Sequence, residues 1–206
     1  MQPFSRVAQL QPSPHPEDPL TTRKRQTGAT AGPFLTDVTT LRANARKQIE
    51  KGPVTAAYGA DLDRVLSLLN DSLATEIVCT LRYKAHYFGA QGLNAEPAAA
   101  EFLQHAAEEQ VHADRLAERI NQLGGTPELN PDTVTSRSHT EYKTPEALLD
   151  MIEEDLVAER IVIQAYSEAI EWLGPNDPTT RRIFEEILAD EEEHADDMLT
   201  LLQRNS

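Results

Sequence analysis

Two short motifs in this sequence pair a glutamate with a histidine three residues later. The first is Glu109-Gln-Val-His112 and the second is Glu191-Glu-Glu-His194. Residues three apart lie on the same face of an α-helix, one turn from each other, so each pair can hold one metal ion between a carboxylate and an imidazole. A single pair arises easily by chance in an acidic helix. Two copies, separated by 82 positions, favour a metal site.

Two further glutamates lie inside apolar stretches. Glu76 stands in Leu-Ala-Thr-Glu-Ile-Val-Cys and Glu159 in Leu-Val-Ala-Glu-Arg-Ile-Val, at nearly the same offset from each other. A carboxylate on a surface that faces the core is costly unless a positive charge compensates it. Four glutamates and two divalent cations would make a nearly neutral cluster. Carboxylate and imidazole ligands without thiolates favour iron or manganese over structural zinc.

The elements that must position these residues are predicted to be helices. Four long segments have apolar residues at helical spacing, and there is almost no β-strand pattern, so we expect helices over about 61–88, 96–123, 144–174 and 177–202. Gly124-Gly125 marks the end of the second helix, and Thr144-Pro145 marks the start of the third. The connections within the first and second pairs of helices are short, which predicts two antiparallel helical hairpins. A polar connection of about 20 residues joins the hairpins and can cross the bundle lengthwise.

The N-terminal region has a different composition. Residues 1–35 are rich in proline, serine and threonine and are predicted to be a flexible tail. Residues 36–59 are expected to hold an accessory helix, at about 37–51, and a linker, whereas residues 60–206 form the four-helix domain. The tail carries Arg23-Lys24-Arg25, but the whole chain has a net charge of −15. That charge argues against nucleic-acid binding by the body and leaves DNA contact through the tail as the weaker alternative.

Residues 61–202 resemble bacterioferritin and the bacterioferritin-like members of the Dps, or miniferritin, group. Four motifs carry the resemblance: Glu76, Glu109-Gln-Val-His112-Ala-Asp-Arg, Asp155-Leu-Val-Ala-Glu159 and Asp190-Glu191-Glu-Glu-His194. Ferritin-like di-iron proteins take one glutamate from each of two helices and a Glu-x-x-His motif from each of the other two. The resemblance implies two iron ions per chain, one held by Glu76 and His112, the other by Glu159 and His194, with Glu109 and Glu191 as bridges. It also implies a place beside the site for Tyr83, two turns after Glu76.

Three departures from bacterioferritin bear on haem and on assembly. Gln110 replaces the methionine that binds haem in that family, so haem is not expected here. Only twelve residues follow His194, too few for the fifth helix that closes a 24-subunit shell. The crossover is also longer than in bacterioferritin. The resemblance therefore implies a homo-oligomer of twelve subunits, with twenty-four as the alternative.

The function implied by the resemblance is that of a ferroxidase. Such a protein oxidises Fe(II) with H2O2 or O2, stores Fe(III) in its shell and protects against oxidative stress. The alternatives are a Dps-type nucleoid protein that binds DNA through its tail, and a dimanganese catalase-like enzyme or di-iron oxygenase on the same bundle. Each has a distinct test: salt-dependent DNA binding for the first, and metal content with O2 release for the second.

The single cysteine and the absence of long apolar segments bear on location. Cys79 cannot form an internal disulfide, which is typical of a reducing compartment, and we expect it to pack as a small buried hydrophobe. The sequence shows no signal-peptide pattern and no apolar stretch of membrane-spanning length. These observations predict a cytoplasmic protein without membrane contact.

Overall fold

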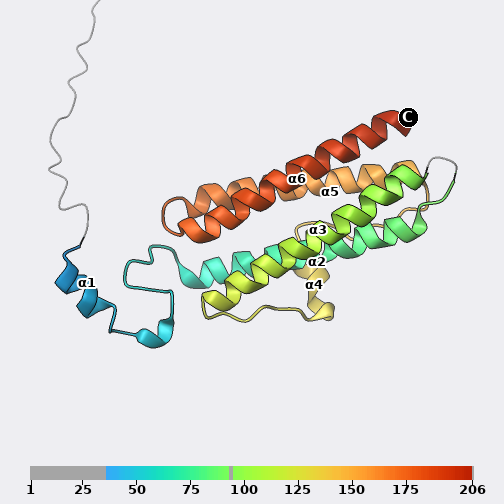
Figure 1. The fold of residues 1–206 in the computed structure, drawn as a ribbon. Coiled ribbons are helices and arrows are strands. Elements are labelled where there is room, and N and C mark those ends of the chain that lie inside the picture. The colour runs from blue at the N-terminus through green and yellow to red at the C-terminus, as the bar shows by residue number, and fades with distance from the viewer. Residues whose placement is uncertain (1–35, 93–94, 206) are drawn as a thin grey trace, which may run out of the picture. The chain divides into compact units, whose positions relative to one another are not determined.

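Helices account for all the regular structure in the part of the chain that this computed structural model describes, residues 36–92 and 95–205. Four long helices form a bundle (Figure 1): α2 (Leu62–Gly89), α3 (Ala95–Gln122), α5 (Leu148–Leu173) and α6 (Pro178–Asn205). The predicted all-α four-helix bundle is therefore confirmed. The flexible tail predicted for residues 1–35 lies outside the described residues. Among the described helices, none is long and apolar enough to span a membrane.

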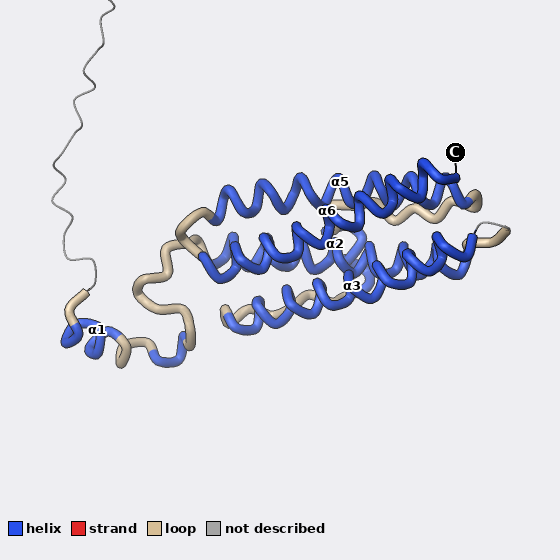
Figure 2. The backbone as a smooth tube through the Cα atoms, turned by 45° about the horizontal axis from the view of Figure 1, so that its top comes forward, coloured by secondary structure: helices blue, strands red, loops and turns tan. Residues whose placement is uncertain are grey.

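The bundle consists of two antiparallel hairpins, as predicted. Helix α2 pairs with α3 and α5 pairs with α6, while α3 also packs on α6 and α2 on α5. The connection between the hairpins runs from one end of the bundle to the other, so that α5 starts at the end opposite to the one where α3 finishes (Figure 1). Figure 2 shows the same side-by-side arrangement of the long helices from a second direction.

The ends of the long helices follow from local sequence signals. The Asp61 carboxylate accepts a hydrogen bond from the Arg64 backbone N–H and caps the start of α2. At the end of α3, Gly124 has a φ of +80°, and the Gly125 N–H donates to the Ile120 carbonyl. This is the left-handed glycine cap expected from the Gly-Gly pair, and it turns the chain into the crossover.

Helix α5 begins later than the Thr144-Pro145 signal predicts. Its first residue is Leu148, and Ala147 at the cap position offers no side-chain hydrogen bond. The preceding segment is held elsewhere, because the buried His86 ring contacts the Lys143 carbonyl through Nε2 at 3.0 Å. A tertiary contact therefore overrides the local start signal.

Two short elements also differ from the sequence prediction. The accessory helix expected over 37–51 is split into α1 (Val38–Asn44) and a 3-10 turn (Ile49–Lys51), separated by Gln48 with a φ of +52°. Neither piece buries a residue, so no packing holds the segment in one helix. The crossover contains an unpredicted helix, α4 (Pro131–Arg137), which Asn130 caps and Pro131 begins.

Two apolar clusters fill the bundle on either side of its middle. The first includes Leu69, Leu73, Leu116 and Phe184, and the second includes Tyr83, Phe102, Ile152 and Met198. Cys79 is fully buried in the first cluster, as expected. These clusters keep water away from the polar residues that lie between them.

Candidate metal centre

The six predicted ligands meet in the middle of the bundle. Each has at most 2% of its surface exposed. Helices α2 and α5 supply one glutamate each, and α3 and α6 supply a Glu-x-x-His pair each. The residues form two groups with two members in common, and in each group the possible ligand atoms lie within 4.8 Å of one another: Glu76, Glu109, His112 and Glu191; Glu109, Glu159, Glu191 and His194.

The two shared glutamates lie between the two histidines. His112 Nδ1 is 3.1 Å from Glu191 Oε1 and 3.4 Å from Glu109 Oε2. His194 Nδ1 is 3.4 Å from Glu191 Oε2 and 3.7 Å from Glu109 Oε1. Each carboxylate therefore turns one oxygen toward each imidazole, which is the placement that bridging two metal ions requires. Glu76 Oε2 lies on the His112 side, 3.8 Å from Nδ1.

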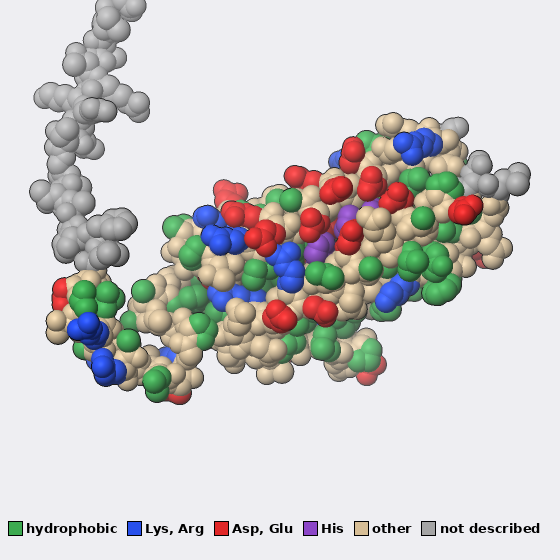
Figure 3. Space-filling model, viewed as in Figure 1, with side chains coloured by type: hydrophobic (Ala, Val, Ile, Leu, Met, Phe, Trp, Pro, Cys, Tyr) green, Lys and Arg blue, Asp and Glu red, His purple; other side chains and the backbone are tan. Residues whose placement is uncertain are grey.

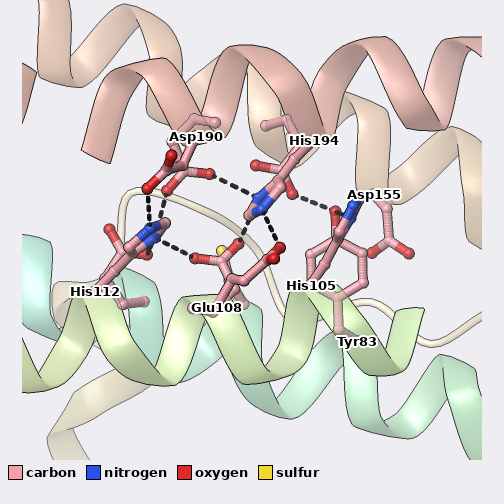
Figure 4. A network of polar contacts seen from close by, with 12 residues as sticks. Tyr83, His105, Glu108, His112, Asp155, Asp190 and His194 are labelled. Atoms are coloured by element: carbon pink, nitrogen blue, oxygen red, sulfur yellow. Dashed lines mark hydrogen bonds and ion pairs between the residues drawn. The ribbon is translucent and has the colours of Figure 1, made fainter. Parts of the chain in front are cut away.

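Each histidine is oriented by a carboxylate on the other hairpin. His112 Nε2 is 3.1 Å from Asp190 Oδ2, and His194 Nε2 is 2.9 Å from Glu108 Oε2 (Figure 4). When Nε2–H donates to these carboxylates, Nδ1 of a neutral ring keeps its lone pair, and it points into the cluster. Asp190 immediately precedes Glu191, and Glu108 immediately precedes Glu109. Each hairpin therefore supplies, next to its own shared glutamate, the carboxylate that holds the histidine of the other hairpin.

Two buried tyrosines hold the outer glutamates in the same reciprocal manner. The Tyr83 hydroxyl on α2 donates to Glu159 Oε1 on α5 at 2.5 Å, and the Tyr166 hydroxyl on α5 donates to Glu76 on α2. Sequence reasoning placed Tyr83 beside the site but missed Tyr166. The internal repeat could have found it, because each tyrosine follows the glutamate of its own helix by seven residues.

The cluster leaves many buried polar atoms without a partner. No hydrogen bond reaches Glu76 Oε2, Glu109 Oε1, Glu159 Oε2, His194 Nδ1 or either oxygen of Glu191. Such atoms are rare in a folded protein and costly unless something else satisfies them. They all lie between the four helices, and hard oxygen and imidazole donors suit iron or manganese. The residues present therefore fit a pair of divalent cations.

Comparison with known proteins places the chain in a family. A model of the ferritin-like domain matches residues 66–205. The chain belongs to the ferritin-like family. Its fold is similar to a dodecameric thioferritin, the bacterioferritin-related protein of Bacteroides fragilis, at 30% identity and a TM-score of 0.68 over 71% of this chain and 88% of that one.

Two other solved structures are similar to this ferritin-like chain, one from each of the two groups that the sequence resembles, the bacterioferritins and the Dps proteins. The bacterioferritin of Desulfovibrio desulfuricans, described with a diiron site, is 26% identical with a TM-score of 0.61, over 69% of this chain and 80% of that one. Dps from Thermosynechococcus elongatus is 21% identical with a TM-score of 0.65, over 68% and 90%. The second likeness concerns the fold alone. The predicted resemblance to bacterioferritin and Dps proteins is thus confirmed.

The charges inside this ferritin-like bundle are strongly coupled. Burial raises the pKa of Glu76 and of Glu159 well above its ordinary value, and the neighbouring carboxylates raise it further. Burial also acts to raise the pKa of Glu109, but the interactions with His112 and His194 outweigh it and hold that pKa below its ordinary range. Burial alone would lower the histidine pKa values, yet the glutamates raise both, that of His194 to about 12. Without a metal, the cluster therefore retains protons that a cation would replace.

Proposed function

We propose that this ferritin-like protein is a ferroxidase, with Fe(II) as its substrate and H2O2 or O2 as the oxidant. The observation that carries the proposal is the buried set of four glutamates and two histidines whose unpartnered atoms converge between the helices. The diiron site described for the Desulfovibrio desulfuricans bacterioferritin supports the same assignment.

The proposed ligand roles follow the two groups. Glu76 with His112 would hold one ion, Glu159 with His194 would hold the other, and Glu109 with Glu191 would bridge them. Two Fe(II) ions held together can supply both electrons that reduce one H2O2 to two water molecules, with two protons consumed. Carboxylates suit this task because they remain good ligands for iron in both oxidation states.

The remaining residues of the site position these ligands. Tyr83 and Tyr166 each hold a glutamate by a hydroxyl hydrogen bond, and Asp190 and Glu108 hold the two imidazoles. The apolar clusters on either side exclude water, which strengthens the attraction between carboxylates and cations. These contacts fix the directions of the ligand side chains before metal binds.

Storage of the oxidised iron is the second half of the proposal. Fe(III) would leave the site for the interior of a homo-oligomeric shell, and removal of Fe(II) together with peroxide would protect against oxidative stress. The dodecameric thioferritin supports a shell of twelve subunits.

A dimanganese catalase-like enzyme is the second candidate, because the same oxygen and nitrogen donors suit manganese. Purified protein would then contain manganese and release O2 from H2O2. A ferroxidase would instead consume Fe(II) without O2 release from peroxide.

Stopped-flow measurement of Fe(II) oxidation tests the leading proposal. The double variant Glu109→Ala/Glu191→Ala removes both proposed bridges and is expected to lower the oxidation rate at least about 100-fold. The matched control is Glu118→Ala/Glu193→Ala, which removes one exposed glutamate from each of the same helices. Circular dichroism checks that both variants keep their helices. Equal oxidation rates in folded bridge and control variants would refute the ferroxidase assignment.

A further inference from the structure

A second group of possible ligands lies on the seam between α3 and α6, outside the six residues described above. It consists of Glu101, His105 and Asp197. His105 Nε2 is 3.4 Å from Asp197 Oδ2 and 4.0 Å from Glu101 Oε2. The histidine is fully buried, whereas the two carboxylate side chains are 37% and 41% exposed. The space-filling view shows histidine atoms between acidic side chains on the face where α3 and α6 lie (Figure 3).

The buried Nε2 atom of His105 makes no hydrogen bond. On the other side of the ring, Nδ1 is 3.3 Å from the Tyr83 hydroxyl, whose own hydrogen is donated to Glu159. Nδ1 must therefore be the donor in this contact, and in a neutral ring Nε2 then carries a lone pair. The lone pair of Nε2 then faces two carboxylates, an arrangement that a bound cation would stabilise.

The internal repeat shows that the bundle does not require this polar group. The 82-residue offset relates Glu101 to Ile183, His105 to Ile187, and Asp197 to Arg115. At the related position Ile187 is fully buried, and Arg115 is paired with Glu186. One half of the pseudosymmetric bundle is thus filled by apolar packing and a salt bridge, while the other half has an imidazole and two carboxylates.

The group also connects to the proposed ferroxidase ligands. His105 is shared with a group that contains Glu108 and His194, and His194 in turn belongs to the central cluster. The rings of His105 and His194 are stacked with their centroids 4.1 Å apart. Figure 4 shows His105 beside His194, which in turn contacts Glu108. Candidate ligands therefore continue without interruption from the surface to the centre.

We propose that Glu101, His105 and Asp197 form a third divalent-cation site on the α3–α6 seam. One imidazole nitrogen and two carboxylate oxygens supply three protein ligands, and the partly exposed carboxylates leave the remaining positions to water. Metal–ligand bonds of about 2.1 Å place neighbouring ligand atoms about 3–3.5 Å apart. The distance from Nε2 to Asp197 already meets this requirement, and Glu101 needs a shift of about half an ångström. A further role of this site, which rests on the proposed function, is to stage Fe(II) on its way between solvent and the central cluster.

Equilibrium dialysis of the full-length protein against Co(II) tests the site. The double variant Glu101→Gln/Asp197→Asn removes the two carboxylate charges, and its control Glu118→Gln/Asp196→Asn removes two exposed charges from the same helices. The variant is expected to bind one Co(II) fewer per chain than the wild type and the control. Equal counts in the three proteins would overturn the third site. If the central cluster binds no Co(II), the number of ions per chain falls equally in all three proteins, and the variant still binds one ion fewer than the other two.

Anomalous scattering from a Co(II)-soaked crystal gives the location. A peak within bonding distance of His105 Nε2, Asp197 and Glu101 is expected, and a third ion bound only elsewhere would overturn the assignment.

The staging role has its own readout, because loss of the site should raise the KM for Fe(II) several-fold and leave kcat unchanged. An unchanged KM in Glu101→Gln/Asp197→Asn would refute staging.

Discussion

At the scale of single residues, the central cluster is organised by pairs that exchange partners between the two hairpins. Tyr83 and Tyr166 each donate to the glutamate of the other's helix. The histidines follow the same rule, because each is held by a carboxylate from the other hairpin. Such contacts set the direction of a ligand before the metal binds, and their loss commonly weakens metal affinity or activity about 10–100-fold.

Tyr166→Phe tests this reciprocal support. The change removes the hydroxyl that donates to Glu76 and leaves the buried carboxylate with one donor fewer, so the affinity for the first Fe(II) should fall about tenfold or more. Anaerobic Fe(II) titration measures the effect, and Tyr142→Phe on the exposed crossover is the control. An affinity equal to that of the control would show that Tyr166 only fills space.

Proton release tests the charge state of the site. The neighbouring glutamates raise the pKa values of His112 and His194, the latter to about 12, and burial raises those of Glu76 and Glu159, so the metal-free site favours bound protons. Metal binding competes with these protons, so protons should be released at pH 7 and the affinity for metal should rise with pH. Calorimetry in buffers of different ionisation enthalpy counts the protons. A binding heat that is independent of the buffer would contradict the assigned charges.

The sequence was sufficient to predict which six residues of the central cluster come together, but not all the side chains that hold them. The Glu-x-x-His spacing and the glutamates in apolar stretches pointed to the cluster because periodicity alone puts them on facing surfaces. Tyr166 was missed because a tyrosine on an apolar helix face reads as ordinary packing. Only its position in the repeat, seven residues after Glu159, distinguishes it.

At the scale of the elements, the starts and ends of the four long helices followed local signals where no distant contact competed. Gly124 ended α3 and Pro178 began α6 as expected. The start of α5 could not be predicted, because the contact between His86 and the Lys143 carbonyl joins residues far apart in the sequence. Helix α4 was missed although Asn130-Pro131 is a start signal, because seven residues give too little periodicity to distinguish a helix from a loop.

Asp177 lies at the start of α6 and joins the cap of that helix to a buried arginine on α3. Its carboxylate accepts from the Thr180 backbone N–H at 3.0 Å and from Arg119 at 3.0 Å, both in a buried position. Asp177→Ala therefore removes a cap and leaves the buried Arg119 guanidinium without its carboxylate partner, which should lower the free energy of unfolding by about 3 kcal/mol. Urea unfolding at matched protein concentration measures the loss, with the exposed Asp132→Ala as control. A change equal to that of the control would contradict this role.

At the scale of the whole molecule, two similar hairpins enclose one site, and they differ in what surrounds it. The seam near His105 is polar, whereas its counterpart near Ile187 is apolar. Outside the bundle core, Val157 on α5 and Leu199 on α6 are more than 40% exposed. Exposed apolar side chains of this kind often lie in contacts between subunits.

The size of the assembly follows from the proposal of a miniferritin-like shell. Light scattering coupled to size exclusion should give a mass of about twelve times the 22.9 kDa chain. A mass near twenty-four chains would instead indicate a bacterioferritin-like shell. A monomer would contradict the storage role, because a single bundle encloses no cavity for mineral.

The central claim is that the buried cluster binds a pair of Fe(II) ions. The most direct test is an anaerobic Fe(II) titration in the Glu101→Gln/Asp197→Asn background, where the proposed third site has lost both of its carboxylates. Binding should saturate at about two tightly held ions per chain, and adding Glu109→Ala and Glu191→Ala should abolish both. Saturation below two ions, or tight binding that survives the loss of both bridging glutamates, would contradict the account.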